Sequence, residues 1–161
     1  MSRYRATYLS ATAIGVDTIF GSLMCPAGNG FNIRRLTGGL VTVGSASAPP
    51  DQNCLLGIAA ATAAGTGGVS TSPTTTLLNQ NSPPALAIAA LTYVTLQPTF
   101  SATAADPVQI PVSSRGGFDL YWEGVEEWQV LKGVTNGICL VNRQNALSSP
   151  LAWKVDVEWE E

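Results

Sequence analysis

Strict alternation of apolar and polar residues is the pattern that most constrains the fold of this chain. Between residues 153 and 159, every odd position is Trp or Val and every even position is Lys, Asp or Glu. A period of two places all the apolar side chains on one face of a β-strand and all the charged ones on the other. Near the N-terminus, Tyr4, Ala6 and Tyr8 alternate with arginine and threonine in the same way. We therefore expect half-buried strands at both ends of the chain.

Short runs rich in β-branched and aromatic residues fill the region between these ends, and clusters of Gly, Pro, Asn and Ser separate them. This pattern is typical of an all-β chain. About eight or nine strands are expected, with no helix. Ten ranges are candidates for these strands, and the one at 108–112 is a short edge piece: 4–8, 18–24, 31–43, 54–60, 87–97, 108–112, 118–122, 127–131, 137–143 and 153–159.

Three of these candidates carry further expectations. The strand at 31–43 is expected to bend at Gly38 and Gly39. The strand at 87–97 is apolar on both faces, which favours burial on both sides. The strand at 108–112 is expected at a sheet edge, because Pro107 and Pro111 flank it and proline cannot donate to a ladder.

The length of 161 residues suits one domain, since domains commonly contain about 100–200 residues. About eight strands in one such domain indicate a single β-sandwich over residues 1–161, and we expect a jelly roll. The segment Ala61–Thr76 consists largely of Ala, Gly, Thr and Ser. It is therefore expected to be a long loop.

The composition argues against several classes of chemistry. Histidine is absent, which removes His-based catalysis and His metal ligands. The three cysteines, Cys25, Cys54 and Cys139, lie far apart in apolar runs, so we expect small buried thiols. No motif indicates a catalytic, metal or cofactor site, and we expect a protein that is not an enzyme and binds no cofactor.

Charge and hydropathy also bear on the partners of the chain. A net charge of −3 argues against nucleic acid. The apolar stretch 83–96 is shorter than the roughly 20 residues that cross a bilayer, so no membrane anchor is expected. The first residues lack the apolar core of a signal peptide, which favours synthesis in a cytosol.

Residues 52–105 contain no charged residue. One interpretation is a solvated surface of Thr, Ser, Asn and Gln. The other is that much of this neutral span faces other subunits, because interface centres are depleted in charge. The charges gather instead towards the two ends of the chain, which suits an oligomer packed through its middle.

Two acidic clusters are candidates for binding. Glu123, Glu126 and Glu127 lie beside Trp122 and Trp128. Carboxylates beside tryptophans suit sugar stacking or a glycosidase pair, although acidic residues in a loop are more often simply solvated. The acidic residues at 156–161 suit a hard cation such as Ca²⁺, and a frayed acidic tail explains them equally well.

Three stretches together resemble the small jelly-roll decoration or cement proteins of tailed bacteriophages. They are Asp17–Phe20 with Arg34–Leu40, Pro73–Leu78, and Gly133–Leu140 with the closing Trp153–Glu161. The resemblance implies a non-enzymatic virion protein, often a homotrimer, that contacts the major capsid protein. It also implies synthesis in the cytoplasm of an infected host.

Two hypotheses follow for the candidate residues. In the first, the neutral span supplies subunit contacts, and Arg3, Arg5, Glu160 and Glu161 pair with the capsid or lie at the rim of the contact. Removal of residues 158–161 is then expected to weaken capsid occupancy and to leave the fold intact. In the second, the chain is a carbohydrate-binding or receptor-binding module of a phage fibre or tail, in which Trp122 and Trp128 form the platform and Glu126 is among the nearby acceptors.

Overall fold

The computed structural model describes residues 1–25, 29–44, 50–79, 81, 83–93, 95–100, 106–123, 128–130 and 136–161. Within these residues the chain forms fourteen strands, more than the eight or nine expected, and no helix. The strands are β1 (Arg3–Leu9), β2 (Thr18–Met24), β3 (Phe31–Thr42), β4 (Asn53–Ala63), β5 (Val69–Thr71), β6 (Thr74–Leu77), β7 (Ile88–Ala90), β8 (Thr92–Tyr93), β9 (Thr99–Phe100), β10 (Val108–Ser113), β11 (Gly117–Tyr121), β12 (Trp128–Val130), β13 (Gly137–Gln144) and β14 (Leu151–Glu160).

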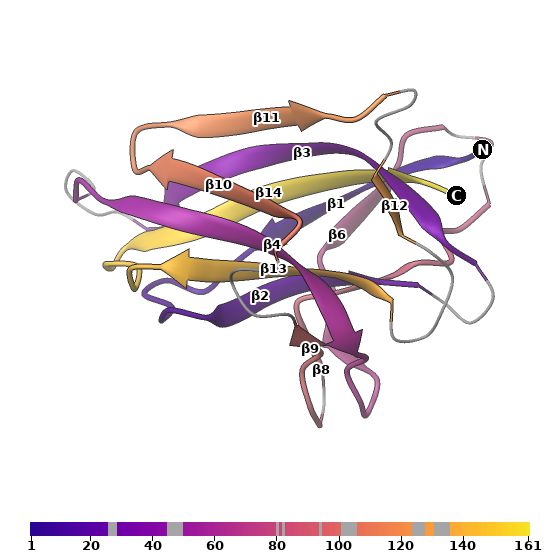
Figure 1. Ribbon diagram of the computed structural model, residues 1–161, viewed down its shortest axis with the longest axis horizontal. Helices are drawn as coiled ribbons and strands as arrows, with labels where there is room; N and C mark the ends of the chain where they lie inside the picture. The colour runs from indigo at the N-terminus through magenta and orange to yellow at the C-terminus, as the bar shows by residue number, and fades with distance from the viewer. Residues whose placement is uncertain are drawn as a thin grey trace.

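Two antiparallel sheets pack face to face and confirm the expected all-β sandwich (Figure 1). Sheet A has the order β11-β3-β14-β1-β6, and β12 also pairs with β3. Sheet B has the order β10-β4-β13-β2-β7, and β9 also pairs with β4. A small separate sheet joins β5 to β8. Both ends of the chain lie at the same end of the sandwich (Figure 1).

The strand order is that of a jelly roll. Four antiparallel pairs are nested along the chain: β1 with β14, β2 with β13, β3 with β11, and β4 with β10. These four nested pairs form one long hairpin. When the hairpin is rolled up, β14 also pairs with β3 and β13 also pairs with β4. The segment between β4 and β10 is an insertion in this scheme, and it adds β6 to the edge of sheet A and β7 to the edge of sheet B.

The core lies between the sheets and depends on the alternation in β1 and β14. Trp153 and Trp159, which the alternation places on the apolar face of the strand, are fully buried in the core. Trp159 stacks on Tyr4 with ring centroids 5.5 Å apart, and Trp153 stacks on Phe20 at 6.2 Å. The indole nitrogen of Trp153 donates to Asn142 Oδ1 at 3.1 Å, so this buried polar group is satisfied.

Two sequence predictions in the insertion are wrong. Ala61–Thr76 is not one loop, because it holds the end of β4, all of β5 and most of β6. Residues 87–97 are not one doubly buried strand, because β7 pairs with β2 whereas β8 pairs with β5. Alanine and threonine runs have no clear period, so the partner strands decide which residues form strands.

β3 has a register shift away from the two glycines at which a bend was expected. The pairing of β3 with β14 shifts between Glu158 and Trp159, at Arg34 and Arg35, and not at the two glycines. Gly38 is required for close packing, since a Cβ there would lie 2.3 Å from the carbonyl oxygen of Lys154. The expected edge strand at 108–112 is confirmed as β10, at the edge of sheet B.

Replacing Trp153 tests the role of the β14 apolar face. Trp153→Ala is expected to lower the free energy of unfolding by about 3–5 kcal/mol, because it leaves a large cavity and an unpaired Asn142 oxygen. Chemical denaturation measures the change. Lys154→Ala, which alters the exposed neighbour on the same strand, is the control and should have little effect. Equal stabilities of the two variants would contradict this account of the core.

Candidate interaction surfaces

The outer face of sheet A collects most of the cationic residues of the chain. Alternate positions of β1, β3, β11 and β14 point away from the core and pair across the strands. We call the resulting surface the charged face. Its charged residues are Arg3, Arg5, Arg34, Arg35, Asp119, Lys154, Asp156, Glu158 and Glu160.

One row of the charged face is a continuous line of ion pairs. The Arg5 guanidinium donates to Glu158, whose carboxylate also lies 4.0 Å from Arg35. Arg35 in turn forms a bidentate pair with Asp119, with N–O distances of 2.9 and 2.7 Å. The hydrogen bonds from Arg35 hold the pKa of the Asp119 carboxyl below its usual range. Arg35 also lies over the ring of the exposed Tyr121, at 5.0 Å from its centroid.

A second group of charges lies closer to the chain ends. Ile33 and Leu36 of β3 are both buried in the core. The register shift lies between them, so that two successive arginines, Arg34 and Arg35, fall between two core residues. Arg34 donates to Glu160 at 2.6 Å, so Glu160 is already paired within the chain. Arg3 lies opposite Glu160, and its Nε atom is buried without a hydrogen-bond partner.

The acidic C-terminal residues are part of the fold and not a frayed tail. Glu158 is buried beside Arg5, and Trp159 belongs to the core. The Glu161 carboxylate accepts hydrogen bonds from the backbone N–H groups of Leu86 and Ala87, both at 2.8 Å, and from the indole of Trp159 at 2.9 Å. The prediction that residues 158–161 are dispensable for the fold is therefore wrong.

Through these hydrogen bonds, Glu161 attaches the insertion to the end of sheet A. A substitution at this position tests the role. Glu161→Ala leaves the two amides of Leu86 and Ala87 without their acceptor. Hydrogen bonds to a charged group contribute about 1.5–3 kcal/mol, so protection of these amides from hydrogen exchange should fall at least about tenfold. Amides of β13 are the internal control and should keep their protection. Unchanged exchange at residues 86 and 87 would contradict the proposed role.

The predicted aromatic platform is mostly directed towards the core. Trp122 and Trp128 are both half-buried and pack against the core residues. Their rings meet edge to face, with centroids 5.5 Å apart and planes at 60°. This arrangement presents no pair of coplanar exposed rings. Glu123 is exposed next to Trp122, whereas Glu126 and Glu127 lie outside the described residues.

The outer face of sheet B carries a buried ion pair that the sequence analysis missed. The side chains of Arg143 and Asp106 are only 2 % and 0 % exposed, and Arg143 donates to both Asp106 oxygens at 2.8 and 2.6 Å. Arg143 also lies 4.9 Å from the ring centroid of Phe100 in β9. A Cβ on Gly57 would lie 2.4 Å from Asp106 Oδ2, so a glycine is needed beneath the pair. This ion pair attaches the end of the insertion to sheet B.

Removing Asp106 is expected to be costly. Asp106→Ala takes two charge-assisted hydrogen bonds from a buried guanidinium, whose pair with the exposed Asp17 at 3.0 Å remains. Breaking a buried pair costs about 3–5 kcal/mol, and the remaining carboxylate places the expected loss near the lower value. Thermal and chemical unfolding measure the loss. Asp51→Ala is the matched control, because Asp51 pairs with Arg115 on the exposed surface and such pairs contribute little. Similar effects of the two substitutions would contradict a structural role for the buried pair.

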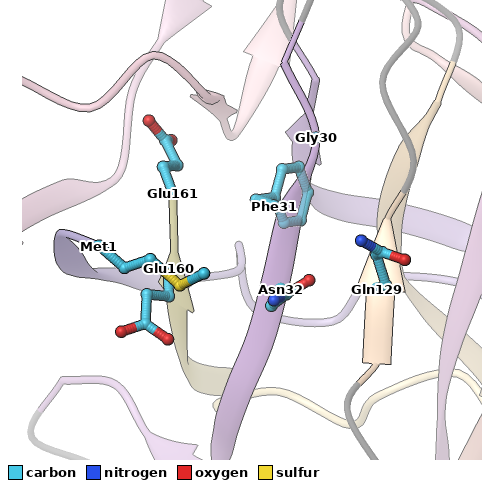
Figure 2. Close-up of a pocket in the computed structure, with 7 residues that line it drawn as sticks. All are labelled: Met1, Gly30, Phe31, Asn32, Gln129, Glu160 and Glu161. Atoms are coloured by element: carbon cyan, nitrogen blue, oxygen red, sulfur yellow. The ribbon is translucent and has the colours of Figure 1, made fainter.

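A hollow of about 370 Å³ lies on the charged face near the chain ends. Figure 2 shows that three neighbouring strands contribute to its lining, with Glu160 on β14, Asn32 on β3 and Gln129 on β12, and that Met1 lies beside Glu160. The carboxylates of Glu160 and Glu161 are both engaged in hydrogen bonds within the chain. The hollow is a shallow feature of the charged face and not a preformed acidic site.

The cysteines match their expected environment. All three are buried and none is in a disulfide. Burial raises the pKa of the Cys25 thiol to about 11 and that of Cys139 to about 12, which suppresses the thiolate form. Among the described residues, no group of three or more Cys, Asp or Glu is placed to hold a metal ion. The described part of the chain also contains no helix with the length and hydropathy of a membrane span.

Comparison of the chain with protein-family models, with curated proteins and with solved structures finds no match.

Proposed function

We propose that this chain is a structural protein of a virus particle, a decoration or cement protein that binds the head lattice and performs no catalysis. In this role it is made in the host cytoplasm, associates with itself as a trimer and contacts the major capsid protein. The observation that carries the proposal is the strand order, because nested pairs in two sheets form the jelly roll, an architecture used by viral capsid domains. The resemblance to phage decoration proteins points in the same direction.

The charged face is the surface that we assign to the capsid. Interfaces are enriched in arginine and tyrosine, and the charged face presents several arginines together with the exposed Tyr121. Its ion pairs hold these side chains in place, which reduces the entropy lost when a partner binds. Many copies on a repeating lattice then multiply modest individual affinities.

The carbohydrate-binding alternative has weaker support. Lectin domains also use the jelly roll, so the fold alone does not separate the two functions. A sugar platform needs an accessible aromatic face, whereas Trp122 and Trp128 are half-buried and pack edge to face. We therefore keep the virion proposal as the conclusion.

Particle occupancy tests the proposal. Particles purified from the source of this sequence should contain the chain in a fixed ratio to the major capsid protein, measured by quantitative mass spectrometry. Tyr121→Ala with Arg35→Ala should lower occupancy at least about fivefold, since aromatic and arginine anchors dominate interfaces. Arg115→Ala, another exposed arginine in an ion pair, is the control and should bind normally. Absence of the chain from the particles would overturn the proposed function.

A further inference from the structure

Two cations on the charged face have no ionic partner within the described part of the chain. The side chains of Arg3 and Lys154 form no ion pair there, whereas Arg5, Arg34 and Arg35 are each paired with a carboxylate. Lys154 is exposed, and Arg3 is half-buried with no acceptor for its Nε atom. An arginine that is partly removed from water and lacks an ionic partner gains from a carboxylate that another molecule brings.

Each carboxylate of the charged face already has a donor within the chain. Asp119, Glu158 and Glu160 accept hydrogen bonds from arginines, and Asp156 accepts one from the Thr7 hydroxyl at 2.5 Å. Glu160 lies opposite the first unpaired cation in the strand register, but its carboxylate is directed to another arginine. The two unpaired cations are therefore the positive charge that the face does not balance by itself.

The charged face is the positive part of an acidic protein. It holds five of the eight cationic side chains of the chain and four of the eleven acidic ones. Its net charge is therefore +1, whereas the remaining residues together carry −4. Complementary charge steers association and orients the two molecules, so an acidic partner is attracted to this face and repelled by the rest of the chain.

The spacing of the two cations indicates a macromolecular partner. Arg3 lies opposite Glu160 and Leu9 lies opposite Lys154, so the two cations leave the same face of sheet A six positions apart along β14. Six residues of a strand span about 20 Å, which is too far for one small anion to bridge. The four carboxylates between and around them repel a chain of phosphates, which favours an acidic protein surface over nucleic acid.

We propose that the partner of the charged face is an acidic protein surface, which places one carboxylate beside Arg3 and another beside Lys154. The inference rests on the proposed function, in which this face contacts the major capsid protein, and it names the chemistry that the contact requires. The row of ion pairs from Arg5 to Asp119 lies between the two cations and belongs to the same contact.

Binding of the purified chain to particles made without it tests the inference. The affinity should fall as sodium chloride is raised from about 50 to 500 mM, because salt screens exposed charges. Arg3→Ala and Lys154→Ala should each lower the affinity at least about threefold, and together at least about tenfold. Arg115→Ala is the matched control, since it also removes one positive charge, but from an exposed turn outside the charged face, and it should bind normally.

Two further measurements separate binding from folding. Lys154→Arg keeps the positive charge and should bind like the parent chain. Because neither cation has an ionic partner within the described chain, both alanine variants should unfold at the denaturant concentration of the parent chain. The salt dependence of the parent chain needs no variant.

The outcomes distinguish the inference from the proposed function. Equal binding of the parent chain and the double variant at every salt concentration overturns the inference and leaves the proposed function in place. A parent chain that neither binds these particles nor occurs on natural ones overturns the proposed function, and the inference falls with it. Binding that is lost when the particles are treated with nuclease identifies nucleic acid as the partner and overturns the inference.

Discussion

Burial of the apolar face of β14 is the interaction on which the rest of this structure depends. β14 pairs with β1 on one side and with β3 on the other, so it joins the two halves of sheet A. Its two tryptophans stack on aromatic rings from β1 and β2. Because these contacts span nearly the whole sequence, the ends of the chain and its middle are stabilised together.

The two outer faces of the sandwich accommodate their charged side chains in different ways. On sheet A, carboxylates and guanidinium groups alternate across the strands and neutralise one another at the surface. On sheet B, Arg143 is buried under the insertion and pairs with two carboxylates, the buried Asp106 and the exposed Asp17. In the part of the chain that the structure describes, most charged side chains thus lie beside one of opposite charge.

The sequence predicted the parts of this fold that have a clear period. The alternation in β1 and β14 predicted both their extent and their buried faces, and Pro111 predicted an edge strand. The Ala- and Thr-rich insertion was not predictable, since its short strands depend on their partners: β6 pairs with β1, β7 with β2, β9 with β4, and β5 with β8. Asp106 and Arg143 are 37 positions apart in the sequence. The one further residue that their contact requires is Gly57, whose missing side chain leaves room for the ion pair.

Among the candidate residues, Arg5 was expected to pair with the capsid or to lie at the rim of that contact, and in the structure it pairs with Glu158 of its own chain. The same is true of Glu160 and Glu161, whose acceptor atoms are used by Arg34 and by the insertion. Sequence alone places such residues near a surface. It does not tell whether an opposite charge is already beside them, because cross-strand neighbours depend on register.

The position of β14 in sheet A also has a consequence for synthesis. β14 is translated after both of its neighbours, so β1 and β3 must remain without their shared partner while the ribosome makes all of the intervening chain. During this interval each nascent chain exposes two unsatisfied strand edges and the aromatic half of its core. Close spacing of ribosomes on one message would bring such chains together, so slow, well-separated initiation or a chaperone that shields strand edges would favour a high yield of folded protein.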